Sequence, residues 1–72
     1  MPGLRKRSLV LAGHATSLAL EPEFWTALEA LARSRGVSLA ACVAAIDTAR
    51  GDASLASACR VTALDFAGRQ RD

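Results

Sequence analysis

Apolar and polar residues alternate in the first part of the chain, which is the pattern of a half-buried strand. In residues 15–20, the side chains of Thr16, Leu18 and Leu20 fall on one face, because successive strand residues point to opposite sides. Residues 7–12 are also β-like, and Gly13 followed by His14 favours a type II′ turn between the two runs. We therefore predict strands over residues 7–20. The pattern leaves open whether the first run pairs within the chain, pairs with another chain, or forms an extended arm.

Apolar residues then recur at helical spacing up to Arg35. Proline is tolerated at the first position of a helix, as Pro22 would be, and Gly36 is suited to a C-terminal cap. Between them Phe24 and Leu28 lie on one helical face. The pattern predicts a helix over residues 22–35 with Phe24 in the core. The adjacent Trp25 lies on a different face, so we expect it to be half exposed or to pack against the N-terminal strand or another subunit.

Two further helices are predicted after Gly36. Ser38 is placed as the N-cap of a helix over residues 38–50, whose stripe contains Val43 and Ile46. Residues 54–68 form the second of these helices, with apolar side chains on more than one face. Such a helix must be buried on most sides. In so short a chain we expect a partner subunit to cover it.

The order of these elements resembles that of the ribbon-helix-helix family of bacterial DNA-binding proteins. The resemblance is carried by TSLALEPEFWTALEALARSRGVSLAACVAAI, about two-fifths of the chain, and the flanking segments add an N-terminal strand and a third helix. It implies a mainly α fold with a short N-terminal β-ribbon, in which two chains form an intertwined homodimer. It further implies that the ribbon enters the major groove of DNA and that the turn before the second helix grips a phosphate.

Size and composition agree with one dimeric domain over residues 1–72. A chain of 72 residues is near the size at which a single core is marginal, yet 51% of its residues are apolar. A homodimer would cover the excess apolar surface. No segment is long and apolar enough to span a membrane, and no secretory signal is recognisable. We expect a cytoplasmic protein.

The distribution of charge along the chain is more informative than its net charge of +2. Arg5, Lys6 and Arg7 are the only charged residues among the first twenty, and we predict that residues 1–6 form a flexible basic arm that binds phosphates or a minor groove. On the ribbon only Ser17 offers a hydrogen-bonding side chain between Ala15 and Ala19, whereas the family commonly has a longer polar or basic residue at the position of Ala15. The predicted DNA-binding residues are Arg5, Lys6, Arg7, Ala15, Ser17, Ala19, Val37, Ser38 and Leu39.

The chain contains few residues of the types that usually catalyse reactions, which argues against an enzyme. The chain has one histidine, no tyrosine and one lysine, and the usual nucleophile and phosphate-loop motifs are absent. Cys42, Cys59 and His14 have no recognised metal-ligand spacing, so no metal or cofactor is predicted, and both cysteines are expected to be buried. The resemblance thus implies a dimeric transcriptional regulator that binds double-stranded DNA. The alternatives are a protein-binding module, such as an antitoxin, and a purely structural dimer.

Overall fold

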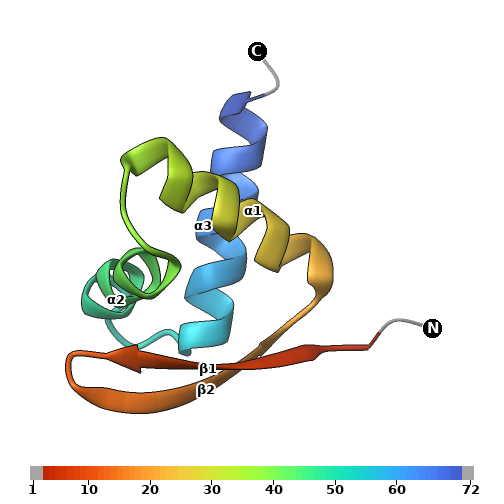
Figure 1. Cartoon of the computed structure of the whole chain (residues 1–72). Coiled ribbons are helices and arrows are strands. Elements are labelled where there is room, and N and C mark those ends of the chain that lie inside the picture. The colour runs from red at the N-terminus through yellow and green to blue at the C-terminus, as the bar shows by residue number, and fades with distance from the viewer. Residues whose placement is uncertain (1–2, 71–72) are drawn as a thin grey trace.

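The computed structural model describes residues 3–70 as a two-stranded hairpin followed by three helices. The elements are β1 (Arg5–Leu11), β2 (His14–Leu20), α1 (Pro22–Arg35), α2 (Leu39–Ala49) and α3 (Leu55–Gln70). All three helices lie on one side of the hairpin (Figure 1). The predicted fold class, a short ribbon followed by helices with an additional C-terminal one, is confirmed. The intertwined homodimer stays a prediction.

The two strands pair with each other inside the chain, which answers the question that the sequence left open. They are antiparallel, from Arg5 opposite Leu20 to Leu11 opposite His14. The turn consists of Ala12 and Gly13, both with positive φ, at 52° and 84°. Positive φ at both central residues is the type I′ arrangement, so the predicted type II′ turn at Gly13 and His14 is wrong. The type I′ turn matches the right-handed twist of the flanking strands.

The predicted flexible arm is wrong for Arg5 and Lys6. Arg5 and Lys6 belong to β1, where they stand opposite Leu20 and Ala19. The indole Nε1 of Trp25 donates a hydrogen bond of 2.8 Å to the backbone oxygen of Arg5, which holds the beginning of β1 against α1. Residues 1 and 2 lie outside the described range.

Local signals in the sequence define the helix ends. Gly36 has φ of 71° and its N–H reaches the carbonyls of Ala32 and Arg33, which ends α1 in a left-handed cap. The Ser38 side chain accepts a hydrogen bond of 3.0 Å from the N–H of Ala41 and so caps α2. Ser54 does the same for α3 through the N–H of Ser57. The third helix continues to Gln70, past the glycine at 68.

The core lies between the hairpin and the helices, and both strands contribute to it. Of the two aromatic residues of α1, Trp25 is the more deeply buried, at 3% exposure, whereas Phe24 packs at the edge of the core. The prediction that Phe24 is the core residue of this pair is therefore wrong. Trp25 is the core residue, and it packs against the N-terminal strand, which was one of the two placements expected for it. The buried residues are Leu11, Leu18, Leu20, Trp25, Leu28, Leu31, Ala32, Cys42, Val43, Ile46, Cys59 and Ala63.

One face of α3 packs against the rest of the chain. Cys59 and Ala63 are buried, and the Nε of Arg60 lies 2.9 Å from a carboxylate oxygen of Glu21. That hydrogen bond holds the pKa of Glu21 below its ordinary value. The opposite face carries Val61 and Leu64, which are 64% and 68% exposed. The chain thus covers one side of α3 and leaves the other apolar side open.

The contact between Trp25 and β1 yields a stability prediction. Trp25→Phe removes the N–H that binds the Arg5 carbonyl and leaves space in the core, so the free energy of unfolding should fall by about 1–3 kcal/mol. Urea denaturation of the two proteins measures the difference. Thr26→Ala, which changes the next and exposed side chain of α1, is the control. If Trp25→Phe cost no more than this control, the indole would not be what holds β1.

Candidate nucleic-acid interface

The outer face of the hairpin, which points away from the helices, is the candidate interface. Alternation along each strand and the strand register decide which residues share this face. Three cross-strand pairs lie on it, namely Lys6 with Ala19, Ser8 with Ser17 and Val10 with Ala15. Five of the six residues are exposed, and Ala19 is half-buried. Because the helices cover only the other side of the hairpin (Figure 1), this ribbon face is open to a partner.

Three side chains on the ribbon face can form hydrogen bonds. Ser8 and Ser17 are directly opposite each other, and each hydroxyl can donate and accept. Lys6 adds a cation, and it makes no ion pair with any residue that the structure describes. Ser8 and Val10 were not among the predicted site residues. Like Lys6, they are even-numbered residues of β1 and therefore lie on the same face. This shared face can be recognised only when the hairpin register is known.

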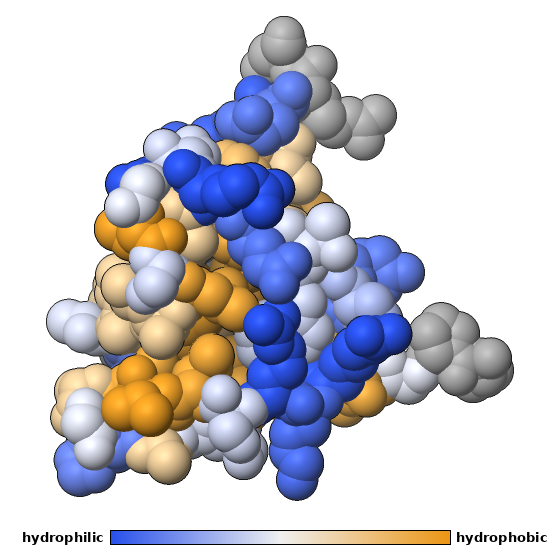
Figure 2. Space-filling model, viewed as in Figure 1, coloured by the Kyte–Doolittle hydropathy of each residue, from blue (hydrophilic) through white to orange (hydrophobic). Residues whose placement is uncertain are grey.

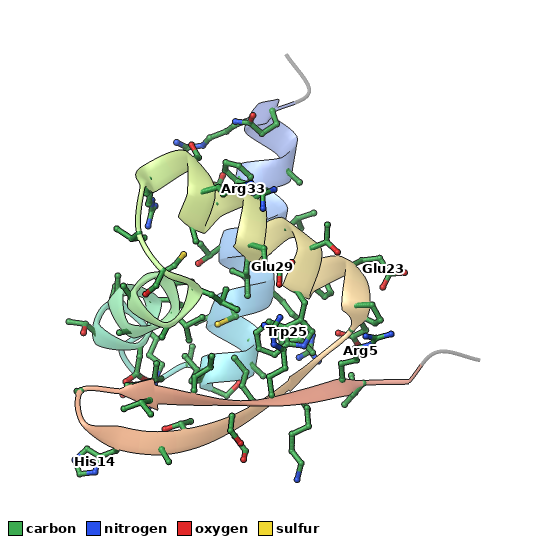
Figure 3. The ribbon with its side chains drawn as sticks, viewed as in Figure 1. Arg5, His14, Glu23, Trp25, Glu29 and Arg33 are labelled. Atoms are coloured by element: carbon green, nitrogen blue, oxygen red, sulfur yellow. The ribbon has the colours of Figure 1, made fainter. Side chains whose placement is uncertain are left out.

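Two of the predicted basic residues lie on the other face. Arg5 and Arg7 stand opposite Leu20 and Leu18, whose side chains point into the core. The guanidinium of Arg7 lies 2.9 Å from a carboxylate oxygen of Glu29 and 4.9 Å from the centre of the Trp25 ring. Figure 3 shows Arg5, Trp25 and Glu29 where β1 passes beneath α1. The three basic residues therefore do not share one face of the hairpin, because Arg5 and Arg7 lie on the helical side and Lys6 on the outer side.

The predicted phosphate-binding turn lies on the helical side of the hairpin. Val37 is exposed, Ser38 is the N-cap and Leu39 is the first residue of α2. Ser38 satisfies the N–H of Ala41, but other N–H groups in the first turn of a helix have no acceptor within that helix. The turn connects α1 to α2 away from the ribbon face (Figure 1). One chain thus offers two separate polar surfaces, and these residues do not converge.

A family model described as a ribbon-helix-helix domain matches residues 4–67. The chain belongs to the ribbon-helix-helix family. The match includes β1 and most of α3. These two elements flank residues 16–46, the segment that carries the resemblance, and both are therefore parts of the family domain. Neither the curated proteins nor the solved structures that were searched contain a significant match to the chain.

The surface over α2 differs in character from the ribbon face. Figure 2 shows hydrophobic colours over α2 and the turn end of the hairpin, and hydrophilic colours over the beginning of β1. A groove of about 370 Å³ lies between α2 and α3. It is lined largely by small side chains such as Ala45, Ala49 and Ala58, with Val61 at its wall and Arg35 and Arg50 among its polar residues. This groove is a candidate contact surface for an apolar partner.

Both cysteines of this ribbon-helix-helix chain are core residues. Cys42 and Cys59 are both free and buried. Burial raises the pKa of Cys42, and it raises that of Cys59 to about 11, with the neighbouring Cys42 and Asp47 adding to the effect. Within the described residues no group of three or more His, Cys, Asp or Glu side chains could hold a metal ion. His14 is exposed at the turn end of β2 (Figure 3).

These thiols should be unreactive in the folded protein. Nucleophilic attack requires the thiolate, and both burial and the raised pKa values keep the two cysteines protonated at neutral pH. We expect a chromogenic disulfide reagent at pH 7.5 to label neither residue rapidly until urea unfolds the chain. A Val61→Cys variant, which puts a thiol on the exposed face of α3, is the positive control. Rapid labelling of native wild-type protein would contradict the buried placement.

Proposed function

We propose that the protein is a DNA-binding transcriptional regulator that places the ribbon face in the major groove. The observation that carries this proposal is a two-stranded antiparallel ribbon with one face packed on helices and the other free of the chain. The major groove admits a two-stranded β-ribbon and displays a different pattern of donors and acceptors for each base pair. A regulator of transcription would act in the bacterial cytoplasm.

The residues of the ribbon face can make three kinds of contact in a groove. The hydroxyls of Ser8 and Ser17 can bond to base edges as donors or acceptors, and Lys6 can bind guanine or a phosphate. Val10, Ala15 and Ala19 can contact thymine methyl groups. With mostly short side chains the ribbon would approach the bases closely but discriminate between them through few contacts.

Phosphate contacts would supply the remaining affinity. The N-terminus of α2 at Val37, Ser38 and Leu39 has N–H groups suited to an anion, and the resemblance assigns it this role. Because the turn is not on the ribbon face of its own chain, it would reach DNA beside the groove rather than in it. Arg5 and Arg7 mainly support the ribbon, since Arg7 already has an anionic partner in Glu29. A homodimer would double each contact.

A second candidate is a protein-binding module, for example an antitoxin. It is favoured by the groove between α2 and α3 and by the exposed Val61 and Leu64. Together they form an apolar surface that no other part of residues 3–70 covers. The ribbon face does not contribute to this surface. The two functions could therefore be carried by one molecule, and they are separable by substitutions on different elements.

The test of the first proposal is the salt dependence of binding to random duplex DNA. Each phosphate that a cation neutralises contributes about 0.9 to the negative slope of log affinity against log salt. We expect a clear slope for the wild-type protein. For Lys6→Ala the slope should be shallower by about 1 for each lysine removed, which is about 2 for a homodimer. Fluorescence anisotropy at several salt concentrations measures both.

Arg69→Ala is the matched control, because it removes one positive charge from the exposed last turn of α3, at the end of that helix far from the hairpin (Figure 1). Its slope should stay close to that of the wild type. A folded protein that bound no duplex even at low salt would refute the DNA-binding proposal. The protein-binding candidate would then be pursued by substituting Val61 and Leu64.

A further inference from the structure

We propose that the hollow between the beginning of β1 and α1 binds a phosphate of the DNA backbone beside the major groove. Arg5 and Arg7 donate hydrogen bonds to this phosphate, in addition to supporting the ribbon. The carboxylate of Glu29 limits the affinity, because it competes with the phosphate for Arg7. The inference rests on the proposed function, since the phosphate belongs to the DNA that the ribbon face contacts.

The hollow has a volume of about 540 Å³ and lies where β1 passes beneath α1 (Figure 3). Four of its seven lining residues are charged, three of them basic and one acidic, so its formal charge is +2. The basic residues are Arg5, Lys6 and Arg7 of β1, and the acidic one is Glu29 of α1. A concave surface with an excess of positive charge attracts anions. An anion is therefore the ligand that these walls favour.

Arg5 places an available guanidinium in the hollow. Its side chain is exposed and makes no ion pair with any residue in the described range 3–70. Its backbone is held in place, because the indole Nε1 of Trp25 donates a hydrogen bond of 2.8 Å to its carbonyl oxygen. The planar guanidinium has donors spaced to bind two phosphate oxygens at once. Arg5 thus offers a phosphate donor from a backbone position that is already fixed.

Arg7 is held in the hollow by a weak ion pair. Its Nη1 lies 2.9 Å from a carboxylate oxygen of Glu29, which is the one hydrogen bond that this guanidinium makes within the described residues. The two side chains are 41% and 45% exposed, and water screens exposed ion pairs. A phosphate next to Arg5 can therefore bind the remaining N–H groups of Arg7. Glu29 opposes this binding, since its negative charge repels the phosphate.

The hollow lies where the proposed docking brings the DNA backbone. The major groove is about 8.5 Å deep, with base edges on its floor and phosphates along its rims. When the ribbon face is turned to the base edges, the opposite face of β1 is directed away from the floor, toward the level of the rims. Within residues 3–70 only β2 pairs with β1, so the other edge of β1 runs beside one rim. Lys6 belongs to the ribbon face and also lines the hollow, so positive charge extends from groove to rim.

Glu29→Gln tests the role of the competing carboxylate. The substitution keeps the size of the side chain and removes its charge, which releases Arg7 to the phosphate. We expect the affinity for duplex DNA at low salt to rise by up to about fivefold, which corresponds to the strength of an exposed ion pair. Fluorescence anisotropy measures the affinity.

Asp65→Asn is the matched control for Glu29→Gln. Asp65 pairs with Arg69 at 3.2 Å on α3, so this variant also removes one negative charge from an exposed ion pair, but far from the hairpin (Figure 1). Its affinity should stay close to that of the wild type. If the two variants bound duplex DNA equally well, net charge alone would explain the gain and the role of Glu29 would be overturned.

Arg5→Ala tests the phosphate donor. The slope of log affinity against log salt should become shallower by about 1 for each arginine removed, whereas Arg69→Ala should leave it unchanged. The carbonyl that Trp25 binds belongs to the backbone and remains in the variant, so urea denaturation should find its stability close to that of the wild type. A slope equal to that of Arg69→Ala would overturn the inference.

The indole N–H signal of Trp25 in the NMR spectrum identifies the source of the phosphate. Trp25 is the one tryptophan of the chain and lines the hollow, so the signal needs no further assignment. We expect duplex DNA to shift it, and inorganic phosphate at the same ionic strength to leave it nearly unmoved, because a free phosphate lacks the contacts that the ribbon face adds. A signal unmoved by saturating duplex would overturn the site. Equal shifts with inorganic phosphate would overturn its assignment to DNA.

These measurements separate the inference from the function on which it rests. If wild-type protein binds duplex DNA and both Arg5→Ala and Glu29→Gln behave like their controls, the proposed function stands and the phosphate site is refuted. If wild-type protein binds no duplex even at low salt, the proposed function itself is refuted. An indole signal of Trp25 that then still moves with inorganic phosphate would assign the hollow to a free anion and overturn its role in DNA binding.

Discussion

The hydrogen bond from the Trp25 indole to the Arg5 carbonyl is the contact on which the ribbon depends. A two-stranded hairpin is at best marginally stable alone in water, so β1 needs a surface to pack against. Trp25 supplies it, because its ring is buried and its one polar atom is satisfied by the backbone of the strand. Arg7 lies over the same ring and pairs with Glu29, which adds a second link between β1 and α1.

Because β1 is held against α1, its basic residues have two different roles. Along β1, residues of odd number face the helices and residues of even number face outward, because side chains alternate along a strand. Arg7 consequently supports the ribbon, whereas Lys6 is available to an anion. The consequence for function is a ribbon face with one cation and two hydroxyls. Affinity for DNA would then come mostly from the phosphate backbone, and sequence preference from few base contacts.

The elements that could be predicted from the sequence are those with local signals. Pro22, Gly36 and Ser38 act through their immediate neighbours. Alternation in residues 15–20 puts Leu18 and Leu20 on one face, and the structure buries both. Contacts between distant segments could not be predicted. Nothing near Arg5 in the sequence indicates that an indole twenty positions later binds its carbonyl, so the sequence predicts an arm where β1 begins. For the same reason Ser8 was missed, since its place on the ribbon face follows from the register.

The central claim is that β1 and β2 of the same chain form the ribbon, and nuclear Overhauser effects in a mixed-label sample test it most directly. Isotope-labelled and unlabelled protein would be unfolded together, refolded and examined for contacts between the α protons of Ser8 and Ser17, which antiparallel pairing brings close. The account predicts that these contacts appear within labelled chains and are absent from the spectrum filtered for contacts between chains. Strong contacts between Ser8 of one chain and Ser17 of another would contradict it.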